Sequence, residues 1–260
     1  MENTKDWDPN LYLKFRNERT QPSIDLVSKI LPDFKPHRII DIGCGPGNSS
    51  QVLVQRWPEA SLLGIDSSAN MIEKAKQDYP EQEWIIADAA SYKSSDKFDL
   101  VFSNATIQWI PDHSKLLSGF HAMLSNKGIL AIQIPLFFDM SVAKAIEHVA
   151  NAAKWKAKTA GVKNLFTIHD KSFYYNVLSG LFSSIDMWET DYMHILESPS
   201  QILEMMRSTG LRPYMERLDT EADKEKFEDE ILTEIKARYP LQKNGKVIFP
   251  FKRLFFIGYQ

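Results

Sequence analysis

Glycines at alternate positions from Gly43 to Gly47 form the stretch of this sequence best suited to binding a ligand. They follow residues 39–42, a run with three isoleucines that is typical of a strand covered on both faces. Residues 48–57 then show helical spacing, and the first N–H groups of such a helix point back at the glycines. A backbone without Cβ atoms turns sharply and lets a ligand approach. The pattern indicates a nucleotide-type ligand site, and a tight strand-to-helix corner without a ligand is the alternative.

The spacing of the glycines narrows the choice of nucleotide cofactor. The dinucleotide fingerprint G-x-G-x-x-G needs its third glycine where this chain has Asn48, which disfavours a nicotinamide-dependent oxidoreductase. The pattern present is acidic-x-G-x-G-x-G, with Asp41 two residues before the first glycine. Cys44 is the one cysteine of the chain, so internal disulfides are excluded, and we interpret it as a small filler of the turn rather than a nucleophile.

Polar residues also end the apolar runs that follow the glycine turn. Residues 61–66 end in Asp66, whose carboxylate at a strand tip can accept hydrogen bonds from two ribose hydroxyls. Asp88 and Asn104 stand in the same relation to the next two runs. Because α/β sheets bind ligands at the carboxyl ends of their strands, we expect these side chains along one edge. A strand-end cap at Asp66 and a solvated loop carboxylate at Asp88 are the alternatives.

The composition excludes several classes of partner. The 260 residues are 43% hydrophobic, which is enough for one large domain with a smaller addition. With 31 basic and 34 acidic residues, the net charge of −3 leaves no electrostatic footprint for nucleic acid or an anionic membrane. The six histidines stand singly, without metal-ligand spacing, so no metal is predicted. We therefore expect a small-molecule substrate.

The hydropathy pattern bears on location and assembly. No stretch reaches the roughly 20 apolar residues of a membrane span, and the charged N-terminus lacks the apolar core of a signal peptide. We expect a cytoplasmic protein. No long exposed apolar stripe is left over, which favours a monomer.

Strands and helices alternate between residues 38 and 134, which predicts an α/β fold. We expect a Rossmann-like, seven-stranded and mostly parallel sheet with helices on both faces, and a helical cap inserted before the last strand. Residues 1–34 carry an aromatic stripe that ends at Arg19 and are predicted to form a helical lid, with docking on the sheet as the alternative. The remaining expectations are a main domain over 35–260, cap insertions at about 136–180 and 198–245, and a last strand at 252–259.

The glycine turn and the strand-end carboxylates resemble those of the class I S-adenosylmethionine-dependent methyltransferases. Beyond these, segments spread over nearly the whole chain resemble one subfamily, the trans-aconitate 2-methyltransferases. The segments are Trp7–Phe15, Asp41–Ser49, Gly64–Ser68, Asn104–His113, Thr209–Pro213 and Tyr239–Gly245. Residues 136–140, Leu-Phe-Phe-Asp-Met, depart from the polar residues expected in a loop that should face the substrate. The identity of the acceptor acid therefore stays open.

The resemblance implies that S-adenosylmethionine is the cofactor. In enzymes of this class the residue corresponding to Asp88 lies beside the adenine ring and its exocyclic amine. The cofactor-binding residues that the resemblance implies are Asp41, Gly43, Cys44, Gly45, Gly47, Asp66, Ser67, Met71, Asp88, Ala89 and Asn104.

The resemblance also implies methyl transfer to a carboxylate oxygen of a small, trans-aconitate-like polycarboxylic acid, giving a methyl ester and S-adenosylhomocysteine. A carboxylate is already ionised at neutral pH, so no general acid or base is expected, and positioning in a dry pocket should supply most of the acceleration. Arginines should clamp the carboxylates that do not react, with plain surface ion pairs as the alternative. The predicted substrate-positioning residues are Arg19, Tyr12, Gln108, Trp109, Arg212 and Tyr214.

Other functions share parts of this pattern. A methyltransferase acting on carbon or nitrogen of another small molecule would carry the same cofactor motifs. An exocyclic-amine methyltransferase usually has Asn/Asp-Pro-Pro-aromatic after its fourth strand, and Ser103–Thr106 differs from that. A non-enzymatic binder of S-adenosylmethionine would need no acceptor pocket, and the large cap argues against it.

Overall fold

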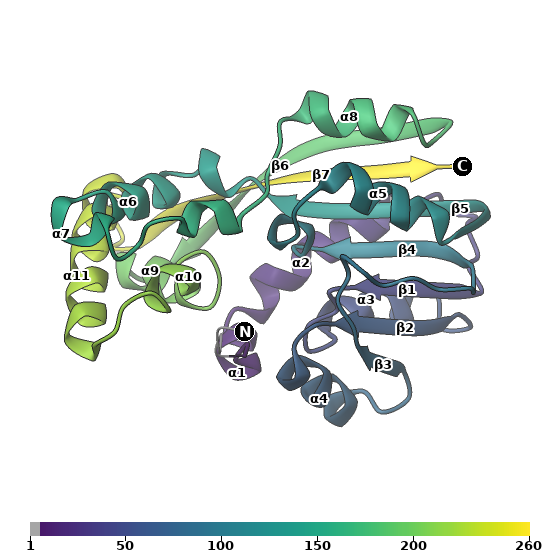
Figure 1. Ribbon diagram of the computed structural model, residues 1–260, viewed down its shortest axis with the longest axis horizontal. Coiled ribbons are helices and arrows are strands. Elements are labelled where there is room, and N and C mark those ends of the chain that lie inside the picture. Colours follow the sequence, from purple (N-terminus) through teal and green to yellow (C-terminus); the bar gives the residue numbers. More distant parts are fainter. Residues whose placement is uncertain (1–5) are drawn as a thin grey trace. The chain divides into compact units, whose positions relative to one another are not determined.

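The computed structural model describes residues 6–260, in which strands and helices alternate through the first half of the chain (Figure 1). The elements from the first strand to the fifth are β1 (Arg38–Ile42), α3 (Asn48–Arg56), β2 (Ser61–Asp66), α4 (Ala69–Asp78), β3 (Glu83–Ile86), β4 (Phe98–Asn104), α5 (His113–Ala122) and β5 (Leu124–Pro135). Two long strands follow, β6 (Ser184–Leu196) and β7 (Val247–Tyr259).

The seven strands form one sheet in the order β3-β2-β1-β4-β5-β7-β6. The pairs β1–β2, β1–β4, β2–β3 and β4–β5 are parallel. Strands β6 and β7 run antiparallel, because the N–H of Ser183, just before β6, donates to the carbonyl oxygen of Tyr259 at the end of β7. The expected Rossmann-like, mostly parallel α/β fold is confirmed.

The burial of each strand follows its place in the sheet. Ile39, Ile40 and Ile42 are all at most 1% exposed, as expected of an inner strand covered on both faces. Strand β3 is an edge strand, and Ile86 is 56% exposed there. Helix α4 begins where the Ser68 hydroxyl accepts a hydrogen bond from the N–H of Met71. These local choices place the ends of β1, β2 and β4 at one edge of the sheet.

The chain divides into two compact units. The first, here called the sheet unit, comprises residues 6–134, 166–189 and 254–260, and the second, the helical unit, comprises residues 135–165 and 190–253. Helix α8 (Lys171–Ser179) packs with α5 in the sheet unit, whereas the sequence placed this segment in the first cap insertion. Residues 166–170, which lie outside any helix or strand, precede α8. The bounds of the cap insertions stay a prediction.

The N-terminal helices belong to the sheet unit. Helix α1 (Pro9–Leu13) packs on α4, and α2 (Arg16–Lys29) packs on α3. Residues 1–5 of the predicted lid lie outside the described residues. The lid function of this segment stays a prediction.

The helical unit has its own core. Its helices are α6 (Ser141–Ala150), α7 (Ala153–Lys156), α9 (Pro199–Arg207), α10 (Arg212–Met215) and α11 (Glu221–Arg238). Helix α11 packs on α6 and α9 through Phe227, Ile231 and Ile235, which are fully buried. No helix among residues 6–260 is both long and apolar enough to cross a membrane.

Candidate active site

The glycine turn is held between the ends of β2 and β4. The N–H groups of Gly43 and Cys44 both donate to the carbonyl oxygen of Ile65, at 2.8 and 3.0 Å. Gly43 has φ +72°, and a Cβ added to it would lie 2.1 Å from the Thr106 side chain. The Thr106 hydroxyl in turn donates to the Gly43 carbonyl oxygen at 3.2 Å. Only glycine fits at this position, because the loop after β4 closes directly onto the turn.

Asp66 and Gly45 lie side by side at the same edge. The Gly45 N–H donates to Asp66 Oδ2 at 2.9 Å, and the Ser68 N–H donates to Oδ1 at 2.9 Å. Burial raises the pKa of Asp66, and these N–H groups offset part of that effect. A Cβ added to Gly45 would meet nothing within 4 Å. There is therefore open space beside Gly45, and the two N–H bonds leave lone pairs on the Asp66 carboxylate for a ligand's hydroxyl groups.

Asp41 lies beneath the turn and is fully buried. Its Oδ2 accepts a hydrogen bond of 2.6 Å from the Ser50 hydroxyl, while Oδ1 has no hydrogen-bond partner among the described residues. Burial raises the pKa of Asp41 to about 7. Burial also raises the pKa of the Cys44 thiol, which is 2% exposed, so this thiol is unsuited to act as a nucleophile.

Asn104, at the end of β4, joins a buried polar network with the first helices. Its Nδ2 donates to the Ser49 hydroxyl at 3.1 Å and to the carbonyl oxygen of Arg19 at 3.4 Å. The Ser23 hydroxyl donates to Ser49 at 3.0 Å. Sequence reasoning missed Ser23 and Ser49, although small polar residues in the first turn of α3 were a visible signal. The network draws α2 to the edge where the glycine turn lies.

Arg19 and Tyr12 form a stacked pair within this region. The Arg19 guanidinium lies 4.1 Å from the centre of the Tyr12 ring and donates to the Tyr12 carbonyl oxygen at 2.6 Å. Arg19 is only 6% exposed, and burial lowers its pKa. Two of the predicted substrate residues are thus in contact with each other, and the backbone of Arg19 is bonded to Asn104. Desolvation of the guanidinium would strengthen its attraction for a carboxylate.

Gln108 and Trp109 occupy the 3₁₀ turn η1 (Ile107–Trp109), which follows β4. The Gln108 Nε2 donates to the Ala105 carbonyl oxygen at 2.7 Å, and its buried Oε1 has no hydrogen-bond partner among the described residues. The Trp109 ring packs 4.7 Å from the ring of Phe166 and 5.6 Å from that of Trp7. Both predicted residues therefore sit at the edge that carries the glycine turn.

The other four predicted cofactor residues differ from one another in exposure. Ser67 and Asp88 are exposed, and Asp88 accepts a hydrogen bond of 2.9 Å from the N–H of Ala90 within its own turn. Ala89 is half-buried. Met71 is 3% exposed and packs in the interior. Cofactor contacts of these four residues stay predictions.

Arg212 and Tyr214 belong to the helical unit. The Arg212 Nε donates to Glu216 Oε1 at 2.7 Å. Tyr214 is 3% exposed and its ring stacks near Phe227, so burial raises its pKa to about 12. The ring of Tyr214 thus packs in the core between α10 and α11. Substrate contact by Arg212 or Tyr214 stays a prediction.

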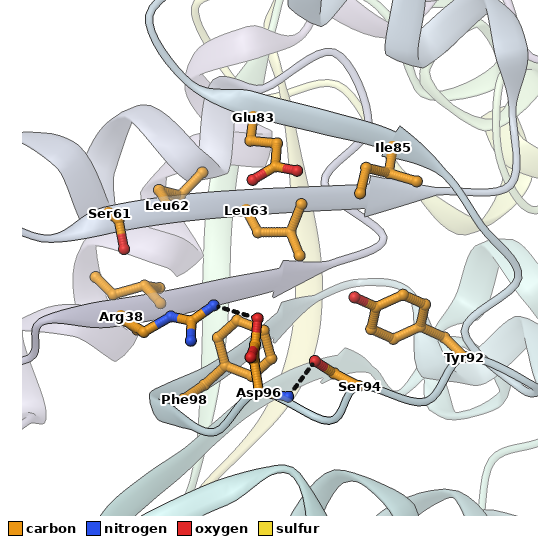
Figure 2. Close-up of a pocket in the computed structure, with 11 residues that line it drawn as sticks. Arg38, Ser61, Leu62, Leu63, Glu83, Ile85, Tyr92, Ser94, Asp96 and Phe98 are labelled. Atoms are coloured by element: carbon orange, nitrogen blue, oxygen red, sulfur yellow. Dashed lines mark hydrogen bonds and ion pairs between the residues drawn. The ribbon is translucent and has the colours of Figure 1, made fainter.

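A cavity of about 220 Å³ lies at the opposite edge of the sheet (Figure 2). Arg38, Ser61 and Glu83 stand at the starts of their strands, and Arg38 pairs with Asp96 at 2.8 Å. Parallel strands start at one edge and end at the other, so this cavity is separate from the glycine turn. The residues lining it are Arg38, Ile39, Ser61, Leu62, Leu63, Glu83, Ile85, Tyr92, Ser94, Asp96 and Phe98.

Comparison with known proteins assigns the family. Residues 39–128 match the family described as a methyltransferase domain. The trans-aconitate 2-methyltransferase of Azoarcus sp. (strain BH72) is 37% identical over 252 residues, covering 97% of this chain and 98% of that protein. The enzyme of the same name from Methylobacterium nodulans is 38% identical over 254 residues, with the same coverage. The chain belongs to the trans-aconitate 2-methyltransferase family. It is therefore an S-adenosylmethionine-dependent methyltransferase.

Solved structures with similar folds are more distant in sequence. The YcgJ protein of Bacillus subtilis superposes with a TM-score of 0.61 at 17% identity, covering 92% of this chain and 98% of that chain. Phosphoethanolamine N-methyltransferase 2 of Haemonchus contortus, in complex with S-adenosyl-L-methionine, gives a TM-score of 0.60 at 17% identity, covering 96% and 56%. At such identities the likeness shows the fold alone.

The residues at the sheet edge fit the cofactor of this family. Gly45 has open space where a side chain would stand, and its N–H is bonded to the Asp66 carboxylate. Helix α3 begins just beyond, so the N–H groups of its first turn follow a loop in which three of the five residues are glycine. Among residues 6–260, no group of three or more His, Cys, Asp or Glu side chains is arranged to hold a metal ion.

Proposed function

We propose that this chain transfers a methyl group from S-adenosylmethionine to a carboxylate oxygen of trans-aconitate, or of a closely similar small polycarboxylic acid. The observation that carries the proposal is a sequence identity of 36–38% to enzymes named trans-aconitate 2-methyltransferase over 97% of the chain. That similarity includes the helical unit, which lies outside the matched methyltransferase domain of residues 39–128.

Asp66 and the glycine turn are the residues we assign to the cofactor. Asp66 accepts hydrogen bonds from the cofactor's ribose hydroxyls, and Gly45 leaves room for the ligand beside it. When bound, S-adenosylmethionine supplies a methyl group on a positively charged sulfur. The chain's own task is then to bring one carboxylate oxygen into line with that methyl group and to exclude water.

Acceptor binding is assigned to the residues after β4 and to α1 and α2. The Gln108 amide oxygen has no hydrogen-bond partner among residues 6–260. We assign the Trp109 ring, which packs on Phe166, to the side of the site where the sulfonium cation would lie. Arg19 carries a desolvated guanidinium, and its backbone carbonyl oxygen accepts a hydrogen bond from Asn104. An arginine on the reacting carboxylate would oppose the transfer, because it stabilises a charge that disappears. We therefore assign Arg19 to a carboxylate that does not react, and the same role for Arg212 stays a prediction.

A transfer assay with labelled S-adenosylmethionine tests the choice of acceptor. The panel contains trans-aconitate, cis-aconitate, citrate, isocitrate and simple monocarboxylates. We expect the turnover of trans-aconitate to be well above that of every monocarboxylate. Only a polyacid has further, unreacting carboxylates that arginines can bind. Equal turnover of monocarboxylates, or none with any acid while S-adenosylhomocysteine still binds, would contradict the proposal.

The oligomeric state and the cellular location are inferred from the sequence alone. We propose a monomer, because the composition leaves no long apolar stripe, and a cytoplasmic location. Sedimentation at micromolar concentration tests the first of these.

A further inference from the structure

The 3₁₀ turn η1 is tied to a distant part of the sheet unit by a buried histidine. His113 is fully buried, and its Nε2 lies 2.8 Å from the carbonyl oxygen of Ile107. Its Nδ1 lies 2.9 Å from the hydroxyl of Tyr174, which is also fully buried. His113 thereby links the turn that carries Gln108 and Trp109 to helix α8.

The partners of His113 fix the direction of every hydrogen bond in this link. A carbonyl oxygen only accepts, so Nε2 carries the proton and Nδ1 is the acceptor. The Tyr174 hydroxyl therefore donates to Nδ1, and its oxygen in turn accepts the N–H of His169 at 3.3 Å. Burial lowers the pKa of His113, which keeps the ring neutral as this chain of bonds requires. Each polar atom of the His113 ring thus has its matching partner.

Further contacts join the same two segments. The N–H of Thr167 donates to the carbonyl oxygen of Gln108 at 2.8 Å. The ring of Phe166 packs against Trp109, and Tyr174 stacks on Phe256 of β7 at 5.3 Å. All three residues of the turn are therefore held, Ile107 by His113 and Gln108 and Trp109 by segment 166–167. Such a grip on the backbone determines where the side chains of Gln108 and Trp109 point.

We propose that His113 and Tyr174 are positioning residues for the acceptor acid, acting through the backbone of η1. The inference rests on the proposed function, because it takes Gln108 and Trp109 as acceptor-binding residues. Neither His113 nor Tyr174 touches the substrate. Replacing either residue lowers kcat/KM for the acceptor acid. It does not move the cofactor residues of β1 and β2.

Two substitutions of His113 separate its two bonds. In His113→Gln the amide nitrogen can still donate to Ile107, whereas in His113→Asn the shorter amide can accept from Tyr174 but falls short of Ile107. We expect His113→Asn to lower kcat/KM for the acid by roughly tenfold or more, since small misplacements of binding groups have effects of that size. His113→Gln should recover most of the loss. The affinity for S-adenosylhomocysteine, measured by calorimetry, should be unchanged in both.

Amide hydrogen exchange supplies a readout that does not depend on turnover. In His113→Asn, and more weakly in Tyr174→Phe, we expect faster exchange at Trp109, Ile110 and Thr167, whose N–H groups bond within η1 or onto it. Exchange at Gly43 and Cys44 should not change. If the exchange at η1 is unchanged, or if His113→Gln loses as much activity as His113→Asn, the inference is overturned.

A direct variant distinguishes this inference from the function on which it rests. Gln108→Ala removes the proposed acceptor contact itself. If Gln108→Ala lowers kcat/KM while His113→Asn does not, the positioning role is wrong and the acceptor assignment survives. If Gln108→Ala has no effect while His113→Asn speeds exchange at η1, the turn is held as described and the acceptor assignment is the part that fails.

Discussion

The N–H of Gly45 donates a hydrogen bond of 2.9 Å to the carboxylate of Asp66, so the glycine turn and the tip of β2 form one structure. A single carboxylate fixes the turn at Gly45, where a side chain would meet open space. This gives Asp66 two roles, one in the shape of the turn and one toward the cofactor.

Asp66→Ala should weaken binding of S-adenosylhomocysteine by roughly 1.5 to 3 kcal/mol, since hydrogen bonds to a charged group are lost. Calorimetry measures this directly. Asp96→Ala is the matched control, because Asp96 is an exposed carboxylate at the opposite edge of the sheet and should leave the affinity unchanged. If Asp66→Ala binds S-adenosylhomocysteine as tightly as the wild type, Asp66 at the end of β2 is not a cofactor-binding residue.

Asp41 should make the protein less stable as the pH rises. The pKa of Asp41 is about 7 in the folded chain, above that of an unfolded aspartate, so the folded state binds more protons between these values. Stability is therefore lost as the pH rises through about 7. Asp41→Asn should raise the free energy of unfolding at pH 8 by roughly 1 to 4 kcal/mol and change it little at the unfolded pKa of about 4.

Urea titrations of the wild type and Asp41→Asn near these two pH values test this expectation, without cofactor present. Asp96→Asn again serves as the control, since its carboxylate is exposed. An Asp41→Asn gain that is the same at both pH values would mean that burial does not shift this carboxyl group.

Arg212 should matter for polycarboxylates and not for the cofactor. Arg212→Ala is expected to raise KM for the acid by roughly tenfold to a hundredfold, the size of a lost charge-assisted pair. Arg212→Lys should restore only part of the affinity, because lysine lacks the planar fork. The measurement is initial-rate kinetics over a range of acid concentrations.

Glu216→Gln controls for the ion pair that Arg212 makes within its own helix. It removes that pair and keeps the guanidinium, so KM for the acid should not rise. If Arg212→Ala and Glu216→Gln both leave KM unchanged, Arg212 only forms an ion pair with Glu216 and does not bind a carboxylate of the acid.

The strands that bear the candidate site were visible in the sequence because β-branched runs ended in glycine or in polar residues. Strand β7 was predicted to start at Lys252, but it starts at Val247 and passes through Pro250. Proline has no N–H to donate to a neighbouring strand, so the sequence alone favours a strand that begins after Pro250. The pairing with neighbouring strands, which extends β7 to Val247, is not visible in the sequence.

The pairing of His113 with Tyr174 could not have been predicted. The two residues are 61 positions apart, and each by itself reads as an ordinary residue on an apolar helix face. Their contact depends on α8 packing against α5, which is a tertiary choice. The same holds for Thr106, whose contact with Gly43 follows from the order of strands in the sheet.

The type of bond formed to the acceptor is the most direct test of the central claim. The product of trans-aconitate and methyl-labelled S-adenosylmethionine would be isolated and treated with mild alkali. A carboxylate ester releases the label as methanol, whereas a methyl group on carbon or nitrogen stays on the product. We predict complete release, and a label that survives alkali would contradict carboxylate methylation and assign the chain to another class of acceptor.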